Sequence, residues 1–187
     1  MAWSTDGRSV YRYFRYCGKE FIRSLKSNNS ADVVFNNTGE EPFEKGYQEK
    51  EDPWDYQLKP YEQAKYRQTL DILPPARFQS GMELACAEGV FSAQLAARVD
   101  RLVGADISPS ALERAKKRCK AYDHVSFQQL DLRKDPLPGL FDLIVCSEVL
   151  YFMGGRDGLA EVAHKLVAGL RPGGKLVMAH MNIVRDD

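Results

Sequence analysis

A strand pattern, a turn of small residues, a helix pattern and a second strand pattern that ends in an acid follow one another between residues 82 and 106. The turn at 85–89 contains two alanines and a glycine, which keep side-chain bulk away so that a ligand can lie against the backbone. The helix expected at 90–98 begins directly after the turn, and its first N–H groups have no partner within the helix. A unit of this kind opens the sheet of nucleotide-binding α/β folds.

The kind of ligand follows from what this unit contains and what it lacks. Asp106 lies about 20 residues after the turn, where a carboxylate can accept hydrogen bonds from both hydroxyls of a ribose. The turn lacks the glycine pattern and the Gly-Lys-Ser/Thr ending of phosphate-binding loops, and Glu88 would repel a pyrophosphate. We therefore expect a nucleoside without phosphates, and the alternative is a generic α/β turn that binds no ligand.

Composition sets broad limits on the class of protein. The chain has 187 residues, enough for one domain with its own core, and its 26 Lys and Arg balance its 26 Asp and Glu. We therefore expect no nucleic-acid partner, and no apolar run is long enough for a membrane span. The four cysteines form no Cys-x-x-Cys pair or Cys/His cluster, so we expect no metal site. Two of them lie in apolar strand patterns, which suits a reducing compartment, and with no signal peptide the expected location is the cytoplasm.

The first part of the chain, 1–53, differs in character from the main domain expected at 54–187. Apolar and aromatic residues in 10–25 fall at three- and four-residue spacing, which predicts an amphipathic helix with a basic face. We expect this helix to pack on the domain, and contact with an anionic partner or a membrane surface is the alternative. Residues 27–53 carry turn formers, acidic residues and prolines, a composition typical of a flexible linker or a mobile flap.

The rest of the chain alternates between helix and strand patterns, which predicts a doubly wound, mostly parallel sheet with helices on both faces. Ser108 and Pro109 suit the N-cap and the first position of one helix, and the basic residues of that helix at 114–120 are expected to form a solvated face. The continuous apolar run at 143–146 predicts a central strand that is buried on both faces. Besides the opening unit, we expect helices at 54–73, from 109 onward and at 159–170, and strands at 125–130, 141–147 and 175–180.

Together these features resemble the class I S-adenosylmethionine-dependent methyltransferases, which have a Rossmann-like fold. The resemblance depends on the turn at 83–89, on Asp106 and Asp131 after successive strands, on the segment 141–151 and on Arg-Pro-Gly-Gly at 171–174. Each signal is weak alone, but all of them occur in the expected order.

Further segments are similar to the nodulation-protein-S-like methyltransferases, whose type member N-methylates a sugar amine. They are Asp-Pro-Trp at 52–54, the residues at 61–66 and the turn with its helix start at 86–91. The similarity covers roughly residues 50–182. In one departure, Ala85 stands where the family pattern usually begins with glycine, and alanine is the smallest replacement.

The resemblance implies roles for the matching positions. The turn would lie under the methionine part of S-adenosylmethionine. Asp106 would accept hydrogen bonds from the ribose hydroxyls, and Ile107 would pack on the adenine ring. Asp131 would accept a hydrogen bond from the adenine amino group, and the N–H of Leu132 would donate one to a ring nitrogen of the adenine. The implied cofactor-binding residues are Trp54, Tyr61, Glu83, Ala85, Cys86, Ala87, Gly89, Asp106, Ile107, Asp131, Leu132 and Glu148.

The sequence says less about the site of the methyl acceptor than about the cofactor site. Trp54 and Tyr61 resemble aromatic residues that close over the cofactor, and core packing is the alternative for both. Methyl transfer from a sulfonium depends largely on alignment, but an amine acceptor must first lose a proton. By position, the candidate catalytic residues are Glu148, Tyr151 and His180, with a structural role as the alternative for His180.

The sequence stops at residue 187, soon after the strand expected at 175–180, so we expect the sheet to lack the last two strands of the methyltransferase fold. That edge strand would be covered by a larger parent protein, by a second copy in a homodimer or by the N-terminal segment. The expected function is methyl transfer from S-adenosylmethionine to a small-molecule acceptor, an amine or a hydroxyl of a sugar-like compound. One alternative is a cofactor-binding or interaction module that has no activity alone. Another is a nucleic-acid methyltransferase, which the basic segment at 8–26 favours and the neutral overall charge opposes.

Overall fold

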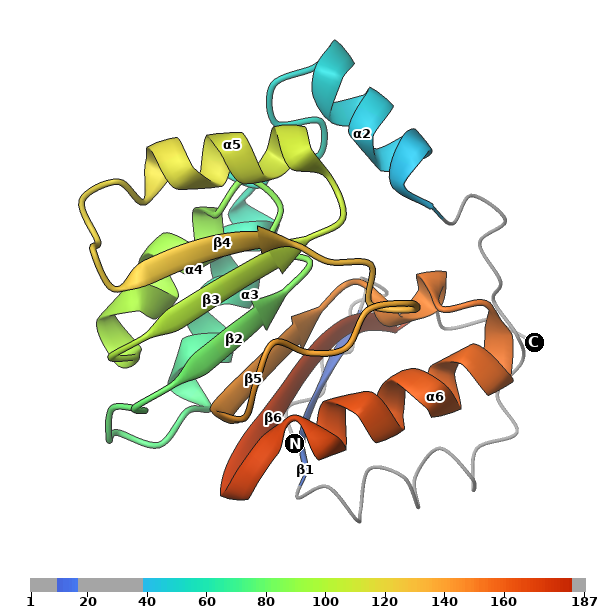
Figure 1. Ribbon diagram of the computed structural model, residues 1–187. Coiled ribbons are helices and arrows are strands. Elements are labelled where there is room, and N and C mark those ends of the chain that lie inside the picture. The colour runs from blue at the N-terminus through green and yellow to red at the C-terminus, as the bar shows by residue number, and fades with distance from the viewer. Residues whose placement is uncertain (1–9, 17–38, 183–187) are drawn as a thin grey trace.

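The computed structural model describes residues 10–16 and 39–182, and these form one sheet with helices on both faces (Figure 1). The strand order is β1-β6-β5-β2-β3-β4, in which β2 to β6 are parallel and β1 is antiparallel to β6. The strands are β1 (Val10–Tyr16), β2 (Gly81–Leu84), β3 (Leu102–Asp106), β4 (Val125–Gln129), β5 (Phe141–Ser147) and β6 (Leu170–Asn182). The helices are α2 (Glu40–Glu49), α3 (Pro60–Asp71), α4 (Val90–Leu95), α5 (Pro109–Arg118) and α6 (Gly155–Ala168), with 3-10 turns η1 (Ala96–Arg98) and η2 (Leu150–Phe152).

This architecture confirms the predicted Rossmann-like, mostly parallel fold. The order reverses between β2 and β5, which lie side by side in the middle of the sheet. Leu84 at the end of β2 lies opposite Ala105 of β3 and Cys146 of β5. The residues that follow these three strands therefore meet at one edge of the sheet. None of the helices in the described part of the chain is long and apolar enough to cross a membrane.

Strand β5 connects the two hydrophobic cores of the molecule. Leu143 and Val145 pack on one face with residues of α3 and α4, whereas Ile144 and Cys146 pack on the other with residues of α6. All four side chains are fully buried. The apolar run predicted a central strand correctly, because only a strand covered on both faces can bury every consecutive side chain.

The start of α5 also follows the local prediction. The Oγ of Ser108 accepts a hydrogen bond of 3.1 Å from the N–H of Ala111, and Pro109 occupies the first helical position. A short side-chain acceptor followed by proline satisfies a free N–H group and presets the helical φ angle. The helix start is therefore determined within four residues.

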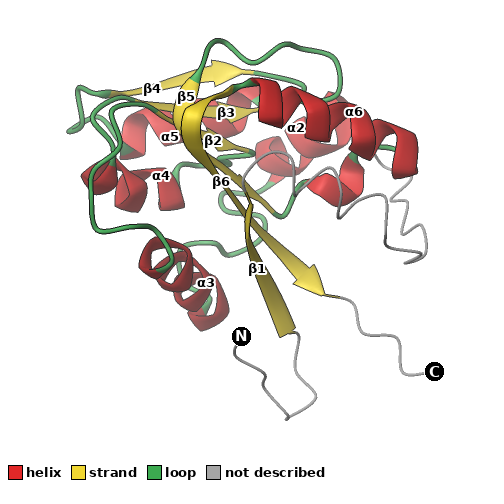
Figure 2. Cartoon of the chain, turned by 90° about the horizontal axis from the view of Figure 1, so that it is seen from below, coloured by secondary structure: helices red, strands yellow, loops and turns green. Residues whose placement is uncertain are grey.

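The N-terminal prediction was wrong where the structure describes it. Residues 10–16 form strand β1, not the first turns of a helix, and pair with β6 from Val10 opposite Asn182 to Tyr16 opposite Leu176 (Figure 2). This segment contains four aromatic residues and a valine besides two arginines, a composition that suits a strand as well as a helix. The open edge of β6 decides between the two, because it offers unpaired backbone groups. Of the three ways in which the edge could be covered, the structure shows pairing with the N-terminal segment. The rest of the helix predicted at 10–25, residues 17–25, lies outside the described residues.

The linker predicted up to residue 53 was also wrong in part, because residues 40–49 form helix α2. Glu40 and Glu41 lie in its first turn, where acidic side chains favour a helix, and Pro42 is tolerated there because no N–H is required. The next helix is shorter than predicted, since α3 begins at Pro60, not at residue 54. The division of the chain into 1–53 and 54–187 stays a prediction.

Replacing Gly89 tests how tightly the turn after β2 is built. Its φ is 74°, and a Cβ there would lie 3.0 Å from both Cα and Cβ of Ala115 in α5. We expect Gly89→Ala to lower the free energy of unfolding by about 1–3 kcal/mol, measured by urea denaturation, because it combines backbone strain with crowding. The matched control is Gly139→Ala, where nothing lies within 4 Å of the new Cβ. Equal losses in both variants would contradict this account.

Candidate functional site

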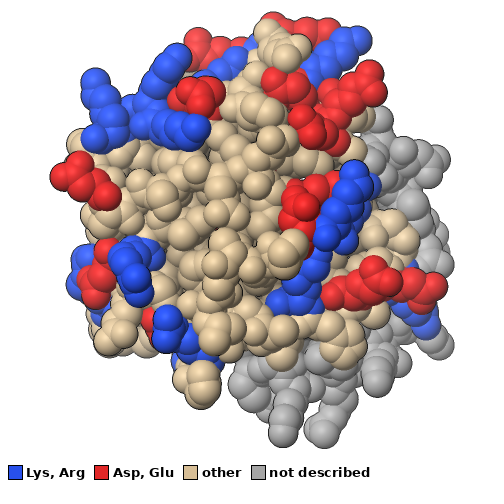
Figure 3. Space-filling view, viewed as in Figure 1, with Lys and Arg blue, Asp and Glu red and all other residues tan. Residues whose placement is uncertain are grey.

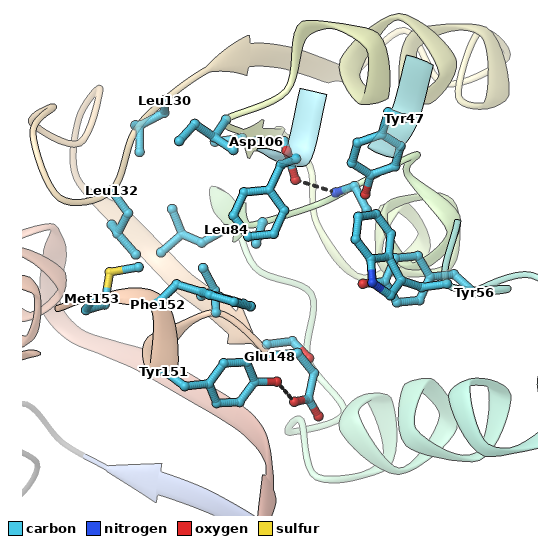
Figure 4. A pocket seen from close by; sticks show the side chains of 18 of the residues that line it. Tyr47, Tyr56, Leu84, Asp106, Leu130, Leu132, Glu148, Tyr151, Phe152 and Met153 are labelled. Atoms are coloured by element: carbon cyan, nitrogen blue, oxygen red, sulfur yellow. Dashed lines mark hydrogen bonds between the residues drawn. The ribbon is translucent and has the colours of Figure 1, made fainter. Parts of the chain in front are cut away.

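A cavity of about 500 Å³ opens where the strand order reverses (Figure 4). Its walls come from α2, from the loop before α3 and the first turns of α3, from the turn after β2, from the ends of β3 and β4, and from residues 147–153 after β5. Crevices at the carboxyl ends of parallel strands, next to such a reversal, are the usual ligand sites of open α/β sheets. The cavity is within the size range of small-molecule sites.

The turn after β2 reaches the cavity through its backbone. Ala85 and Ala87 both line the cavity and both have positive φ angles, 53° and 49°. This conformation is strained for residues other than glycine and is concentrated at ligand sites. Larger side chains would fill the space above the turn. Cys86 and Gly89, which were predicted to bind the cofactor, are part of the same turn but do not line the cavity.

Asp106 ends β3 at the cavity wall and fixes the turn beside it. Its carboxylate accepts a hydrogen bond of 2.8 Å from the N–H of Ala87 (Figure 4). It accepts a second hydrogen bond, of 3.0 Å, from the N–H of Ser108. The residue is 7% exposed, and burial raises the pKa of Asp106, although these N–H groups favour its charged form. It is an acceptor presented at the cavity wall, next to the small-residue turn.

A second carboxylate follows β4. Asp131 lines the cavity and pairs with the guanidinium of Arg133, with 2.8 Å between Nη2 and Oδ2. Although burial acts in the opposite direction, the hydrogen bonds and charge of Arg133 lower the pKa of Asp131 to about 2. Ile107 and Leu132, the apolar residues predicted to lie beside these acids, also line the cavity. This end of the cavity therefore combines hydrogen-bond acceptors with apolar walls.

Glu83 does not take the predicted position at the cofactor. It points away from the cavity, is 5% exposed, and its Oε2 accepts a hydrogen bond of 2.5 Å from the Oγ of Ser92 in α4. Burial raises the pKa of Glu83 to about 8. The side chain joins β2 to α4 below the turn, because alternate residues of a strand face opposite sides of the sheet.

Glu88 is also directed away from the cavity, so it gives no ground for excluding phosphates. It is 1% exposed and pairs with Arg114 of α5, with 2.7 Å between Oε1 and Nη1. The same oxygen accepts from the N–H of Asp52, and Arg114 donates to the carbonyl of Tyr47. Arg114 is therefore part of the fold and not of the solvated basic face predicted for α5. Lys and Arg side chains still gather over the end of this helix (Figure 3).

Helix α2 forms a wall of the cavity that the sequence analysis missed. Its residues Phe43 and Tyr47 line the cavity, and their four-residue spacing next to acidic residues is the signal that could have revealed an amphipathic helix. Glu44 accepts hydrogen bonds from the Oγ of Ser108 at 2.6 Å and from the N–H of Ser110 at 3.1 Å. Through these bonds α2 is fastened to the start of α5.

The two aromatic residues predicted to close over the cofactor, Trp54 and Tyr61, both line the cavity. They are 37% and 38% exposed, which is more than core packing would leave. The Trp54 ring lies 5.0 Å from the Tyr47 ring and 5.9 Å from the Tyr56 ring, measured between centroids. The three aromatic rings therefore form a cluster that covers one side of the cavity.

The other end of the cavity carries the predicted catalytic residues. Glu148 follows β5 with a φ of 52°, and its N–H donates to the carbonyl of Ala179 at 2.9 Å. The hydroxyl of Tyr151 donates to Oε2 of Glu148 (Figure 4). His180 does not line the cavity, because it lies behind Tyr151 with 5.8 Å between ring centroids. Burial, together with the charge of Lys65, lowers the pKa of His180 to about 4, so the ring is neutral near pH 7.

Comparison with known proteins gives consistent matches. A family model described as nodulation protein S (NodS) matches residues 40–185. Nodulation protein S of Sinorhizobium fredii strain NGR234 is 34% identical over 128 residues, which are 68% of this chain and 59% of that protein. The protein of the same name from Rhizobium tropici is 34% identical over 68% of this chain and 54% of its own length. The chain thus spans less than two thirds of the length of these curated relatives.

Solved structures agree with the sequence matches. The N-methyltransferase NodS from Bradyrhizobium japonicum WM9, in complex with S-adenosyl-l-homocysteine, superimposes with a TM-score of 0.68 at 34% identity. The match covers 74% of this chain and 70% of that one. A protein from Pseudomonas syringae described as a putative methyltransferase matches with a TM-score of 0.56 at 37% identity, over 65% of this chain and 76% of that one.

The raised pKa of Glu83 makes a prediction about stability and pH. The ordinary glutamate pKa is 4.5, and that of Glu83 in the folded chain is about 8. As the pH rises between these values, the unfolded chain releases this proton and the folded chain keeps it, so this group lowers stability progressively. We expect Glu83→Gln, which mimics the protonated form, to match the wild type near pH 4.5 and to exceed it by about 2–4 kcal/mol at pH 8.

Urea denaturation across this pH window measures the difference. Glu161→Gln, at an exposed position of α6, is the matched control and should give a difference that does not change with pH. A constant difference for Glu83→Gln would contradict the assignment of the buried proton to this residue.

Proposed function

Because this chain belongs to the nodulation protein S family, we propose that it binds S-adenosylmethionine in the cavity and transfers the methyl group to an amine of a small, sugar-like molecule. The observation that carries the proposal is the position of Asp106. Its carboxylate lies at the cavity wall, at the end of β3 and beside a turn of small residues with positive φ angles. A ribose placed there would meet a hydrogen-bond acceptor on one side and bare backbone on the other.

The rest of the wall fits the same molecule. Beyond Asp106, the apolar side chains of Ile107 and Leu132 could enclose a flat adenine ring, with Asp131 as an acceptor for its amino group. On the opposite side of Asp106, Ala85 and Ala87 leave room for the methionine part. Glu148 and Tyr151 line the other end of the cavity and would hold the methyl acceptor.

The residues at that end can prepare an amine for attack. When bound, S-adenosylmethionine supplies a methyl group on a positively charged sulfur. An amine that enters as an ammonium gives one proton to the carboxylate of Glu148 and becomes a neutral nucleophile. Glu148 would hold this nitrogen in line with the methyl carbon, so that a carbon–nitrogen bond could form while the carbon–sulfur bond breaks and leaves its electron pair on sulfur. The Tyr151 hydroxyl, whose pKa burial raises, keeps its proton and orients Glu148.

A second candidate function is a cofactor-binding module that needs another segment or a partner for turnover. The observation in its favour is that the chain spans less than two thirds of its curated relatives. Binding without turnover on any amine or hydroxyl acceptor would support this alternative.

Calorimetric titration of S-adenosylmethionine and S-adenosylhomocysteine into the 187-residue chain tests the cofactor site. We expect Asp106→Asn to weaken binding of both by about tenfold or more, because it removes the charge from the acceptor and keeps its shape. The matched control is Asp100→Asn, an exposed aspartate that precedes the other end of β3, which should leave affinity unchanged. Equal affinity of the wild type and Asp106→Asn would sink the proposal that Asp106 holds the ribose.

A further inference from the structure

Strand β6 continues past the end of β5, and there it pairs with β1 (Figure 2). The last residue pair between β5 and β6 joins Ser147 to Ala179. From the next residue onward, β1 is the strand that pairs with β6 in the described part of the chain, beginning with Arg12 opposite His180. The backbone of β6 at this point is therefore held from one side only.

The same two residues of β6 contact the side chains at one end of the cavity. The carbonyl of Ala179 accepts a hydrogen bond of 2.9 Å from the N–H of Glu148. The ring of His180 lies edge-on to the ring of Tyr151, with 5.8 Å between centroids, and the Tyr151 hydroxyl donates to Glu148. Glu148 and Tyr151 both line the cavity. A shift of β6 here would therefore move both of them.

Backbone pairing matters at this point because polar contacts do not direct His180. Both of its ring nitrogens are buried, and neither has a hydrogen-bond partner among the residues that the structure describes. The position of this ring therefore follows from the backbone of β6 and from packing against Tyr151. Glu148 has a φ of 52°, a strained conformation that persists only where the surrounding structure holds it. The carbonyl of Ala179 is part of that surrounding structure.

The pairing also determines which N–H groups of β1 face β6. The N–H and C=O of one strand residue point to the same side, and successive residues alternate between the two sides. The carbonyl of Ala179 faces β5, so the N–H of His180 faces β1. Because Arg12 lies opposite His180, the N–H of Arg12 faces β6 in return. Three residues later, the N–H of Arg15 faces the outer edge of the sheet.

We propose that the edge of β6 is a strand-docking surface and that its occupant, β1, positions Glu148 and Tyr151 at the cavity. The partner that this surface fits is an antiparallel strand, because main-chain groups supply the contacts. β1 lies outside the segment 40–185 that the family model matches, whereas β6 lies inside it. Arg12 is a positioning residue that acts through the backbone of β6. The inference goes beyond the proposed function and holds for whichever ligand the cavity takes.

Two proline variants of the full chain separate loss of pairing from loss of a side chain. Arg12→Pro removes an N–H that faces β6, whereas Arg15→Pro removes one that faces the outer edge, and both variants lose an arginine. Amide hydrogen exchange, followed by NMR, measures the protection of the N–H groups of His180 and Glu148. We expect Arg12→Pro to lower both protections about tenfold and Arg15→Pro to leave them within about twofold of the wild type.

The N–H of Cys86 is the internal control, because it donates to the carbonyl of Ala105 at 3.0 Å on the far side of the sheet. Its protection should stay unchanged in both variants. Loss of protection at His180 without any change at Glu148 would overturn the positioning role. Equal losses in the two proline variants, or a loss that includes Cys86, would also overturn it, because neither would follow the direction of the N–H groups.

A milder variant keeps the test available if Arg12→Pro does not fold. Val10 lies opposite Asn182 at the end of the pairing, and its N–H faces β6 like that of Arg12. We expect Val10→Pro to lower the protection of His180 and Glu148 about threefold, again without a change at Cys86. No change at Glu148 in this variant would contradict the proposal in the same way.

A peptide added in trans tests the docking surface itself. A capped peptide of residues 10–16 should restore the protection of His180 and Glu148 in the proline variant, with a saturable dependence on concentration. The same peptide with Arg12→Pro is the matched control and should restore neither. Failure of the unsubstituted peptide at millimolar concentration would overturn the docking surface. The samples contain no cofactor, so these results are independent of whether the chain binds S-adenosylmethionine.

Discussion

The rest of the site depends on the two backbone hydrogen bonds that the Asp106 carboxylate accepts. They join the end of β3 to the turn after β2 and to the start of α5. The N–H of Ala87 can reach the carboxylate because the turn takes left-handed conformations at Ala85 and Ala87. The same geometry removes side-chain bulk from the ligand side of the turn. One buried acid thus fixes the turn beside the cavity and forms part of the cavity wall.

Around Asp106 and the turn beside it, hydrogen bonds and an ion pair hold in place the segments that form the walls of the cavity. Glu44 holds α2 on the start of α5 through Ser108 and Ser110. The ion pair between buried Glu88 and partly exposed Arg114 holds the loop that follows α2. Because these contacts lie outside the cavity, the wall formed by Phe43, Tyr47 and Trp54 does not require a ligand to be in place. A buried pair of this kind loses stability mainly when one partner is removed.

The two ends of the cavity differ in the side chains that line them. At one end, Asp106 and Asp131 present acceptors among apolar side chains, which suits a nucleoside. At the other end, the Nζ of Lys65 lies 2.7 Å from Oε2 of Glu62 and 3.7 Å from Oε1 of Glu148. The family to which the chain belongs includes a structure described as an N-methyltransferase, and this arrangement is consistent with that chemistry.

The sequence by itself determined the elements that depend on a few neighbouring residues. The turn before α4, the acid at the end of β3, the Ser108 cap and the fully buried run of β5 were all predicted, because capping and hydrophobic period act locally. The tertiary structure alone decided the rest. Strand β1 needs the open edge of β6, and α2, too short to be stable alone, needs its contacts with α5. The exclusion of His180 from the cavity and the pairing of Lys65 with Glu62 likewise depend on packing between elements, and no spacing along the chain encodes such distances.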